Sequence, residues 1–176
     1  MTGFHPSQRI RYCPFCGSAR FVWDGVKRHR CQDCGHVLYT NAAAAVIAVI
    51  ENGRDGLLMV RRKFDPAKGS LDLPGGFVDL GEKAEEALRR EVMEEVHLEV
   101  VASQFLMTLP NRYLYDELCY FTVDLVFRCQ VASLQALQAG DDAASAQFYP
   151  LQEICLEEIG LDSVRNVVRW LRVHEV

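Results

Sequence analysis

The chain has 176 residues, of which 49% are apolar and 24% are charged, as in an ordinary folded globular protein. Its longest apolar run, Ala42 to Ile50, is far shorter than the roughly 20 residues that cross a bilayer. The N-terminus carries no apolar signal region, so we expect a cytoplasmic protein. The net charge of −5 is uneven, because residues 1–40 are basic and the remainder is acidic, which disfavours nucleic acid as a partner of the larger part.

The first 40 residues contain two closely spaced pairs of cysteines. Each pair encloses two residues and is followed by glycine, and the four cysteines are Cys13, Cys16, Cys31 and Cys34. Because this spacing lets four thiolates reach one ion, it indicates a closed tetrahedral Zn²⁺ site. We predict a structural zinc ribbon over residues 1–40, with short strands at 19–23 and 28–30. His29 and His36 are interpreted as surface residues, since the thiolate set is complete.

Residues 41–176 are predicted to form a second, larger domain. Its expected strands lie at residues 42–51, 57–61, 100–108 and 120–128. Helices are expected at residues 82–96 and 161–173, and no element is predicted for the small and polar residues 132–147. Mixed strands with two well-separated helices favour an α/β sandwich.

The helix expected at residues 82–96 carries carboxylates on its inner side. Its apolar arc, which should face the core, consists of Ala84, Ala87, Leu88, Val92 and Val96. Glu91 and Glu95 project inside this arc, and Glu94 lies at its margin. A purely structural helix would not turn unpaired carboxylates inward, because burying each charge is costly. Three carboxylates at this spacing suit Mg²⁺ or Mn²⁺, whereas a solvated acidic face is the alternative.

The sequence around this helix resembles the signature of the Nudix hydrolases. The match begins at Gly76, continues after five residues at Glu82, and resumes after seven more in the segment from Arg90 to Leu98. Each specified position agrees except the last glycine, which is His97 here. The Leu-Pro-Gly-Gly segment that ends at Gly76 is also typical of that family.

The resemblance implies a Nudix-type α/β/α sandwich with a mixed sheet, which cleaves a pyrophosphate bond with a metal-activated water. It implies that three glutamates bind Mg²⁺ or Mn²⁺, namely Glu91, Glu94 and Glu95. It also implies that Glu82 lies near this site and that Arg90 orients one of the glutamates. The Gly76 carbonyl is a further candidate ligand. The general base is either a helix glutamate or an acid of a later loop, Asp141 or Asp142.

His97 stands where the family pattern has a glycine that ends the helix in a left-handed conformation. Another residue there costs up to about 1–2 kcal/mol, although histidine enters this region more often than most residues. We therefore interpret His97 as a structural departure that leaves the metal ligands intact.

A four-cysteine ribbon before such a domain resembles the NADH pyrophosphatase branch of the family. The Ser-Gln-Pro-Trp-Pro-Phe motif of that branch corresponds here to Thr-Leu-Pro-Asn-Arg-Tyr at residues 108–113, without its glutamine and tryptophan. Arg112 is a candidate phosphate contact, and Tyr113 or Tyr115 could stack on a base or serve only as strand residues. The predicted partner is a small nucleotide such as ADP-ribose or NAD(H), and the choice among them stays open.

The alternative function is a non-catalytic protein that senses a nucleotide or binds nucleic acid through the zinc ribbon. The complete set of family glutamates and Arg90 disfavours it, because a sensor does not need a full metal cluster. A homodimer is compatible with the family resemblance, but the sequence does not fix the oligomeric state.

Overall fold

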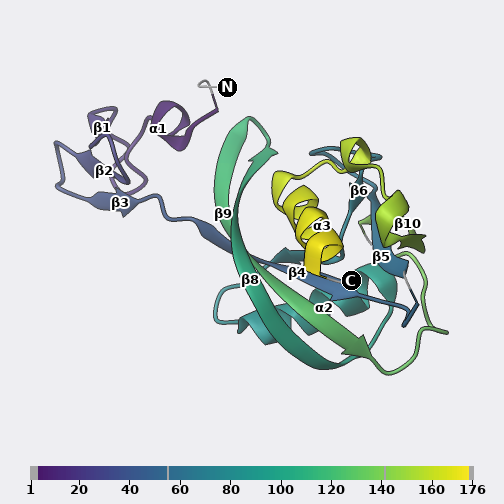
Figure 1. Ribbon diagram of the computed structural model, residues 1–176. Helices are drawn as coiled ribbons and strands as arrows, with labels where there is room; N and C mark the ends of the chain where they lie inside the picture. The colour runs from purple at the N-terminus through teal and green to yellow at the C-terminus, as the bar shows by residue number, and fades with distance from the viewer. Residues whose placement is uncertain (1–3, 55, 141, 175–176) are drawn as a thin grey trace. The chain divides into compact units, whose positions relative to one another are not determined.

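The computed structural model describes residues 4–54, 56–140 and 142–174 (Figure 1). The chain forms two compact units. The first comprises Met1–Ala42 and Arg112–Phe121, and the second comprises Ala43–Asn111 and Thr122–Val176. No sequence feature predicts the second segment of the first unit. The division at residue 40 stays a prediction.

The first unit contains a three-stranded antiparallel sheet. Its strands are β1 (Phe21–Trp23), β2 (Arg28–Cys31) and β3 (Val37–Tyr39), with β2 in the middle. The two predicted strands are confirmed with small changes of boundary, whereas β3 and the short helix α1 (Pro6–Arg9) were not predicted. The β1–β2 turn is held by Asp24, whose Oδ1 accepts backbone N–H groups 2.9–3.2 Å away. The apolar core is small: among the described residues it consists of the buried Cys13, Phe21 and Cys31, with Ile10 and Leu38 partly buried against it.

The rest of the first unit joins its N-terminal segment to the tip of a hairpin. The backbone N–H of Cys119 donates to the carbonyl oxygen of Phe4 at 2.8 Å. Arg9 pairs with Glu117 at 3.1 Å, and the His5 ring meets the edge of Phe121 with 5.3 Å between the centroids. These contacts explain why Arg112–Phe121 belongs to this unit.

The second unit contains two β-sheets. The first sheet has the order β7-β4-β9-β8 and the second has the order β10-β5-β6. The strands are β4 (Ala43–Ile50), β5 (Gly56–Arg62), β6 (Leu71–Asp72), β7 (Gly75–Phe77), β8 (Val100–Tyr115), β9 (Leu118–Val131) and β10 (Ala143–Pro150). Strand β4 pairs parallel with β9 and antiparallel with β7, so the sheet is mixed.

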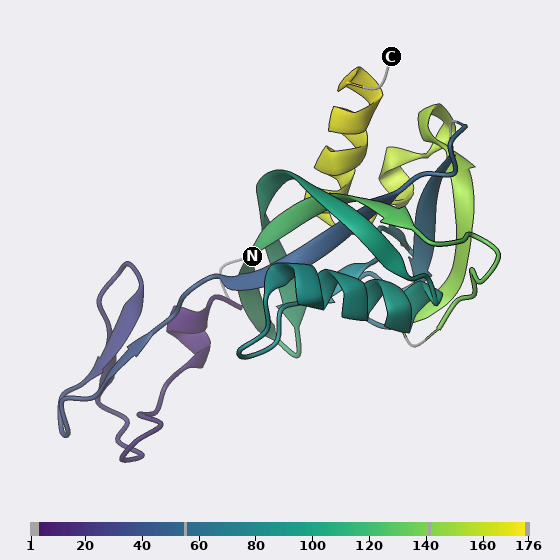
Figure 2. The ribbon, with the colours of Figure 1, turned by 90° about the horizontal axis from the view of Figure 1, so that it is seen from below.

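Two helices cover opposite sides of β4, as Figures 1 and 2 show: α2 (Ala84–Val96) and α3 (Asp162–His174). Alternation along β4 explains both layers, because successive side chains of a strand point to opposite faces. Val46 and Ile50 pack in the core with α2, whereas Ile47 and Val49 pack in the core with α3. The predicted α/β sandwich is confirmed. No helix in the described ranges has the length and hydropathy of a membrane span.

The structure departs from the expected elements at places with a local cause. Helix α2 begins two residues later than expected, because Lys83 is its N-cap and donates its backbone N–H to the Glu86 carboxylate at 3.0 Å. The unpredicted β10 lies at the edge of its sheet and pairs only with β5. An edge strand that is partly exposed does not need an apolar run, so the small polar residues of this segment concealed it. Two short 3₁₀ helices follow, at Leu151–Glu153 and Leu156–Glu158.

The C-terminus of α2 confirms the expected conformation of His97. This residue is left-handed, with φ 57° and ψ 29°, and its N–H donates to the carbonyl oxygen of Met93 at 3.1 Å. Its Nδ1 lies 3.1 Å from the carbonyl oxygen of Gln138. This side-chain hydrogen bond, which glycine cannot make, therefore offsets part of the free energy that the left-handed backbone costs.

We expect His97→Gly to leave the free energy of unfolding within about 1 kcal/mol of wild type, because relief of backbone strain offsets the lost hydrogen bond. His97→Ala keeps the strain and loses the hydrogen bond, so it should destabilise by about 1 kcal/mol or more. Urea unfolding of the two variants measures the difference. An alanine variant as stable as the glycine variant would contradict this account.

Candidate metal and active site

The four predicted cysteines lie together in the first unit. Their sulfur atoms are all within 4.8 Å of one another, with 3.7 Å between Cys13 and Cys34 and 3.6 Å between Cys16 and Cys31. Four thiolates at this separation are able to hold one metal ion.

The two cysteine turns share one backbone geometry. In each turn the glycine N–H donates to the carbonyl oxygen of the first cysteine, at 2.9 Å for Gly17 and 3.1 Å for Gly35. Both glycines have positive φ, 73° and 76°, which glycine adopts without steric cost. The glycine after each pair thus folds the turn so that both sulfurs face the same point.

The interpretation of His29 as a surface residue was wrong. His29 is 1% exposed, and its ring stacks on Phe21 with 5.0 Å between the centroids. His29 and Cys31 both lie on the inward face of β2, because every second residue of a strand shares a face. So small a unit has few other groups to bury there. Burial lowers the pKa of His29. His36 is half-buried and stacks on Phe15 at 5.2 Å.

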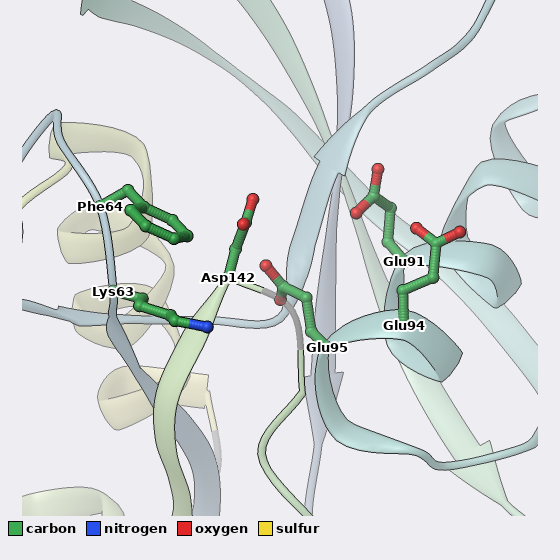
Figure 3. Close-up of a pocket in the computed structure, with 6 residues that line it drawn as sticks. All are labelled: Lys63, Phe64, Glu91, Glu94, Glu95 and Asp142. Carbon is green, nitrogen blue, oxygen red and sulfur yellow. The ribbon is translucent and has the colours of Figure 1, made fainter.

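The second site is a cavity of about 380 Å³ beside α2. Its described lining residues are Lys63, Phe64, Glu91, Glu94, Glu95 and Asp142. Figure 3 shows the three glutamates on one side of Asp142, and Lys63 and Phe64 on the other. As expected, Glu91 is more buried than Glu94: the Glu91 side chain is 15% exposed and the Glu94 side chain is 46% exposed.

Arg90 connects the acidic residues of this region. Its guanidinium donates to Glu82 with two bonds of 3.0 Å, to Glu91 at 2.8 Å and to Glu94 at 3.1 Å. A further N–H donates to the carbonyl oxygen of Phe77 at 3.0 Å. The hydrogen bond to Glu82 contributes most to raising the pKa of Arg90, and Arg90 in turn lowers the pKa of Glu82. One cation thus fixes the orientation of three carboxylates.

The glycine pair before α2 gives these carboxylates room. The N–H of Gly75 donates to Oε2 of Glu95 at 3.1 Å. A Cβ on Gly76 would overlap the Glu91 carboxylate, and a Cβ on Gly75 would overlap the carbonyl oxygen of Val46. Gly75 therefore does not tolerate a side chain, and a side chain at Gly76 would displace the Glu91 carboxylate.

Burial disfavours the charged form of the two inner glutamates of this cluster. Desolvation raises the pKa of Glu91, and it raises the pKa of Glu95 to about 8. The nearby acids Asp72 and Asp142 act on Glu95 in the same direction. Arg90 pairs with Glu91 and Glu94, and Arg62 pairs with Asp72. Lys63 also lines the cavity, yet among the described residues the acids outnumber these cations. Such a donor set fits a divalent cation.

The remaining predicted residues have different outcomes. Asp142 lines the cavity, whereas Asp141 lies outside the described residues. Arg112, Tyr113 and Tyr115 belong to the first unit and are not among the cavity's described lining residues, so their role in substrate binding stays a prediction.

Sequence reasoning missed Lys63 and Phe64. They directly follow β5, and Phe64 stands between two charged residues in a polar loop. An isolated aromatic residue in such a loop was the available signal.

The family model of the NUDIX domain matches residues 41–171 of this chain. The chain belongs to the NUDIX family. An ADP-ribose pyrophosphatase of Methanocaldococcus jannaschii is 35% identical over 138 residues, which cover 76% of this chain and 77% of the relative. The predicted NUDIX hydrolase is therefore confirmed.

Other relatives are longer than this chain. The NAD-capped RNA hydrolase NudC of Pseudomonas aeruginosa is 26% identical over 144 residues, which cover 82% of this chain and 49% of that relative. The chain thus spans about half the length of the curated NudC relatives that it matches. A crystal structure of a NUDIX hydrolase from Nitrosomonas europaea aligns with a TM-score of 0.70 and 20% identity, over 94% of this chain and 92% of that one. At this identity the similarity supports the fold alone.

We expect the metal-free protein to lose stability as the pH rises, in part through Glu95. Its pKa in the folded state, about 8, exceeds the usual 4.5, so the folded protein binds this proton more tightly than the unfolded chain does. That contribution is fully present below pH 4.5 and is lost as the pH rises through about 8. Glu95→Gln should therefore melt at a higher temperature than wild type at high pH without metal.

Thermal melts in a chelator at about pH 5.5 and about pH 8.5 measure this effect. Glu85→Gln, on the exposed face of α2, is the matched control and should follow wild type. Equal pH dependence in wild type and Glu95→Gln would contradict the assignment of a strained carboxylate.

Proposed function

We propose that this NUDIX hydrolase cleaves the pyrophosphate bond of a nucleoside diphosphate linked to a second group, with ADP-ribose or NAD(H) as the substrate class. The observation that carries the proposal is the convergence on one cavity of three glutamates, the half-buried Glu91 and Glu95 and the exposed Glu94. The relatives described above, an ADP-ribose pyrophosphatase and NAD-capped RNA hydrolases, support the substrate class. A homodimer and a cytoplasmic location stay predictions.

We assign the divalent cation, Mg²⁺ or Mn²⁺, to the carboxylates of Glu91, Glu94 and Glu95. The Gly76 carbonyl is proposed as a further ligand. A cation bound there supplies charge neutralisation for the phosphate oxygens and activates water. The donor set supports this assignment, because it is made of hard oxygens with too few positive partners.

The protein's own groups orient the reactants. Arg90 holds Glu82, Glu91 and Glu94 in fixed positions before substrate arrives, and the Gly75 N–H holds Glu95. In the proposed hydrolysis, the water oxygen forms a bond to one phosphorus, the bridging P–O bond breaks, and a carboxylate takes the proton of the water. A helix glutamate or Asp142, which faces α2 across the cavity, is proposed as that base (Figure 3).

We assign a structural Zn²⁺ to the four cysteines of the first unit. The described core of this unit has only three buried apolar residues, which is too few to hold a fold of this size alone. Thiolates are soft donors that suit zinc, and four of them leave no open position for a substrate. The proposed role is therefore to supply folding free energy.

Purified protein should contain about one zinc per chain, bound through sulfur. Cys13→Ser or Cys34→Ser should lose that zinc and unfold the first unit, because the metal replaces a missing core. Metal analysis and amide hydrogen exchange of residues 4–40 measure both effects. Cys155→Ser is the control, since Cys155 is exposed and outside the cluster. A zinc-free wild type with a folded ribbon would refute this assignment.

Glu94→Gln and Glu95→Gln should each lower the turnover of ADP-ribose by about a hundredfold or more under saturating Mg²⁺. Glutamine keeps the size and the hydrogen-bonding capacity of glutamate but removes the charge that holds the cation. Glu86→Gln is the control on the same helix, because its amide oxygen can still accept the Lys83 N–H. Initial rates with ADP-ribose, NADH, NAD and nucleoside triphosphates give both the effect and the preferred substrate.

Wild-type turnover in both glutamine variants would remove the catalytic assignment. The chain would then be better regarded as a nucleotide-binding protein without this activity.

A further inference from the structure

One aromatic side chain lines the otherwise charged cavity. Phe64 is 54% exposed, and every other described lining residue is an acid or a lysine. Figure 3 shows its ring across the cavity from the glutamates of α2, with Asp142 between them. The Phe64 side chain is half exposed, so part of its ring stays open to a bound ligand.

The loop that carries Phe64 is held in place from several directions. Arg62, the last residue of β5, pairs with the buried Asp72 at 2.7 Å and donates to the Pro66 carbonyl oxygen at 2.6 Å. The N–H of Gly69 donates to the carbonyl oxygen of Arg62 at 2.8 Å, which closes the loop. The N–H of Lys63 donates to the carbonyl oxygen of Asp142 at 2.8 Å. The ring is therefore presented at a set position on the cavity wall.

A cation lies over this ring. Nζ of Lys63 is 5.3 Å from the centroid of Phe64. A nucleotide carries an aromatic base at one end and phosphate at the other, which matches a flat apolar surface next to an ammonium group. The cavity volume of about 380 Å³ is also within the range of small-molecule sites.

We propose that Phe64 is a stacking platform for the aromatic base of the substrate and that Lys63 contacts its phosphate. The inference rests on the proposed function, because that function places the diphosphate at the glutamates opposite. It adds a specificity device, since a ring-bearing ligand gains from Phe64 and a ligand without a ring does not.

Binding of AMP and of ribose 5-phosphate tests the proposal, because the two molecules differ only in the adenine. Calorimetric titration is done in Mn²⁺ on the full chain. Phe64→Leu should weaken AMP by roughly tenfold and leave ribose 5-phosphate unchanged. Phe64→Tyr keeps an aromatic ring and should bind AMP as wild type does. Lys63→Met should weaken both ligands, because it removes a phosphate contact.

Phe105→Leu is the matched control, since Phe105 belongs to the same unit, is 53% exposed and is not a lining residue of the cavity. It should bind both ligands as wild type does. Melting temperatures of all variants separate a loss of folding from a loss of stacking, and Phe64→Tyr should restore AMP binding where Phe64→Leu loses it.

Three results would overturn the proposal: no binding of AMP to wild type, equal effects of Phe64→Leu on both ligands, or no effect on either. The failure of the proposed function looks different. In that case wild type hydrolyses neither ADP-ribose nor NADH, while AMP binding still depends on the ring at position 64.

Discussion

The burial of carboxylates that share one cavity, together with the repulsion between them, is the constraint on which the active region depends. Glu91 and Glu95 are drawn toward the core by the same helical spacing that buries Val92 and Val96. Arg90 relieves part of the repulsion by binding three acids at once, yet burial still raises the pKa of Glu95 to about 8. Buried carboxylates without positive partners would destabilise the fold, so bound cations would account for this arrangement.

The backbone of the strands next to α2 passes close to these carboxylates. Strand β4 supplies apolar side chains to both cores, which fixes the distance between the sheet and α2. Strand β7 pairs with β4 through Gly75 and Gly76, so no side chain separates the backbone from the carboxylates. The cavity is lined by α2, by Asp142 and by the loop that carries Phe64.

The sequence was most informative where chemistry requires a strict spacing. The proximity of the four cysteines and the gathering of the α2 glutamates at one cavity could be predicted, because groups that share a metal ion recur at fixed intervals in the sequence. Their role as metal ligands stays a prediction. The left-handed His97 followed from a single departure in such a pattern. Strand β10 could not be found by periodicity, since an edge strand need not alternate. His29 and Phe64 were missed for a related reason, because a polar residue in a tiny core and an aromatic residue in a loop both oppose the usual preferences.

The two clusters of this chain differ in donor chemistry, and that difference separates their roles. Four thiolates packed within 4.8 Å form a closed set in a unit that has almost no core, so a metal there acts through folding. The glutamates instead face a cavity that also holds Phe64 and Lys63, so a metal there has room for a ligand. Soft sulfur and hard carboxylate oxygen select different ions. The proposed structural zinc and the proposed catalytic cation would therefore not compete for the same site.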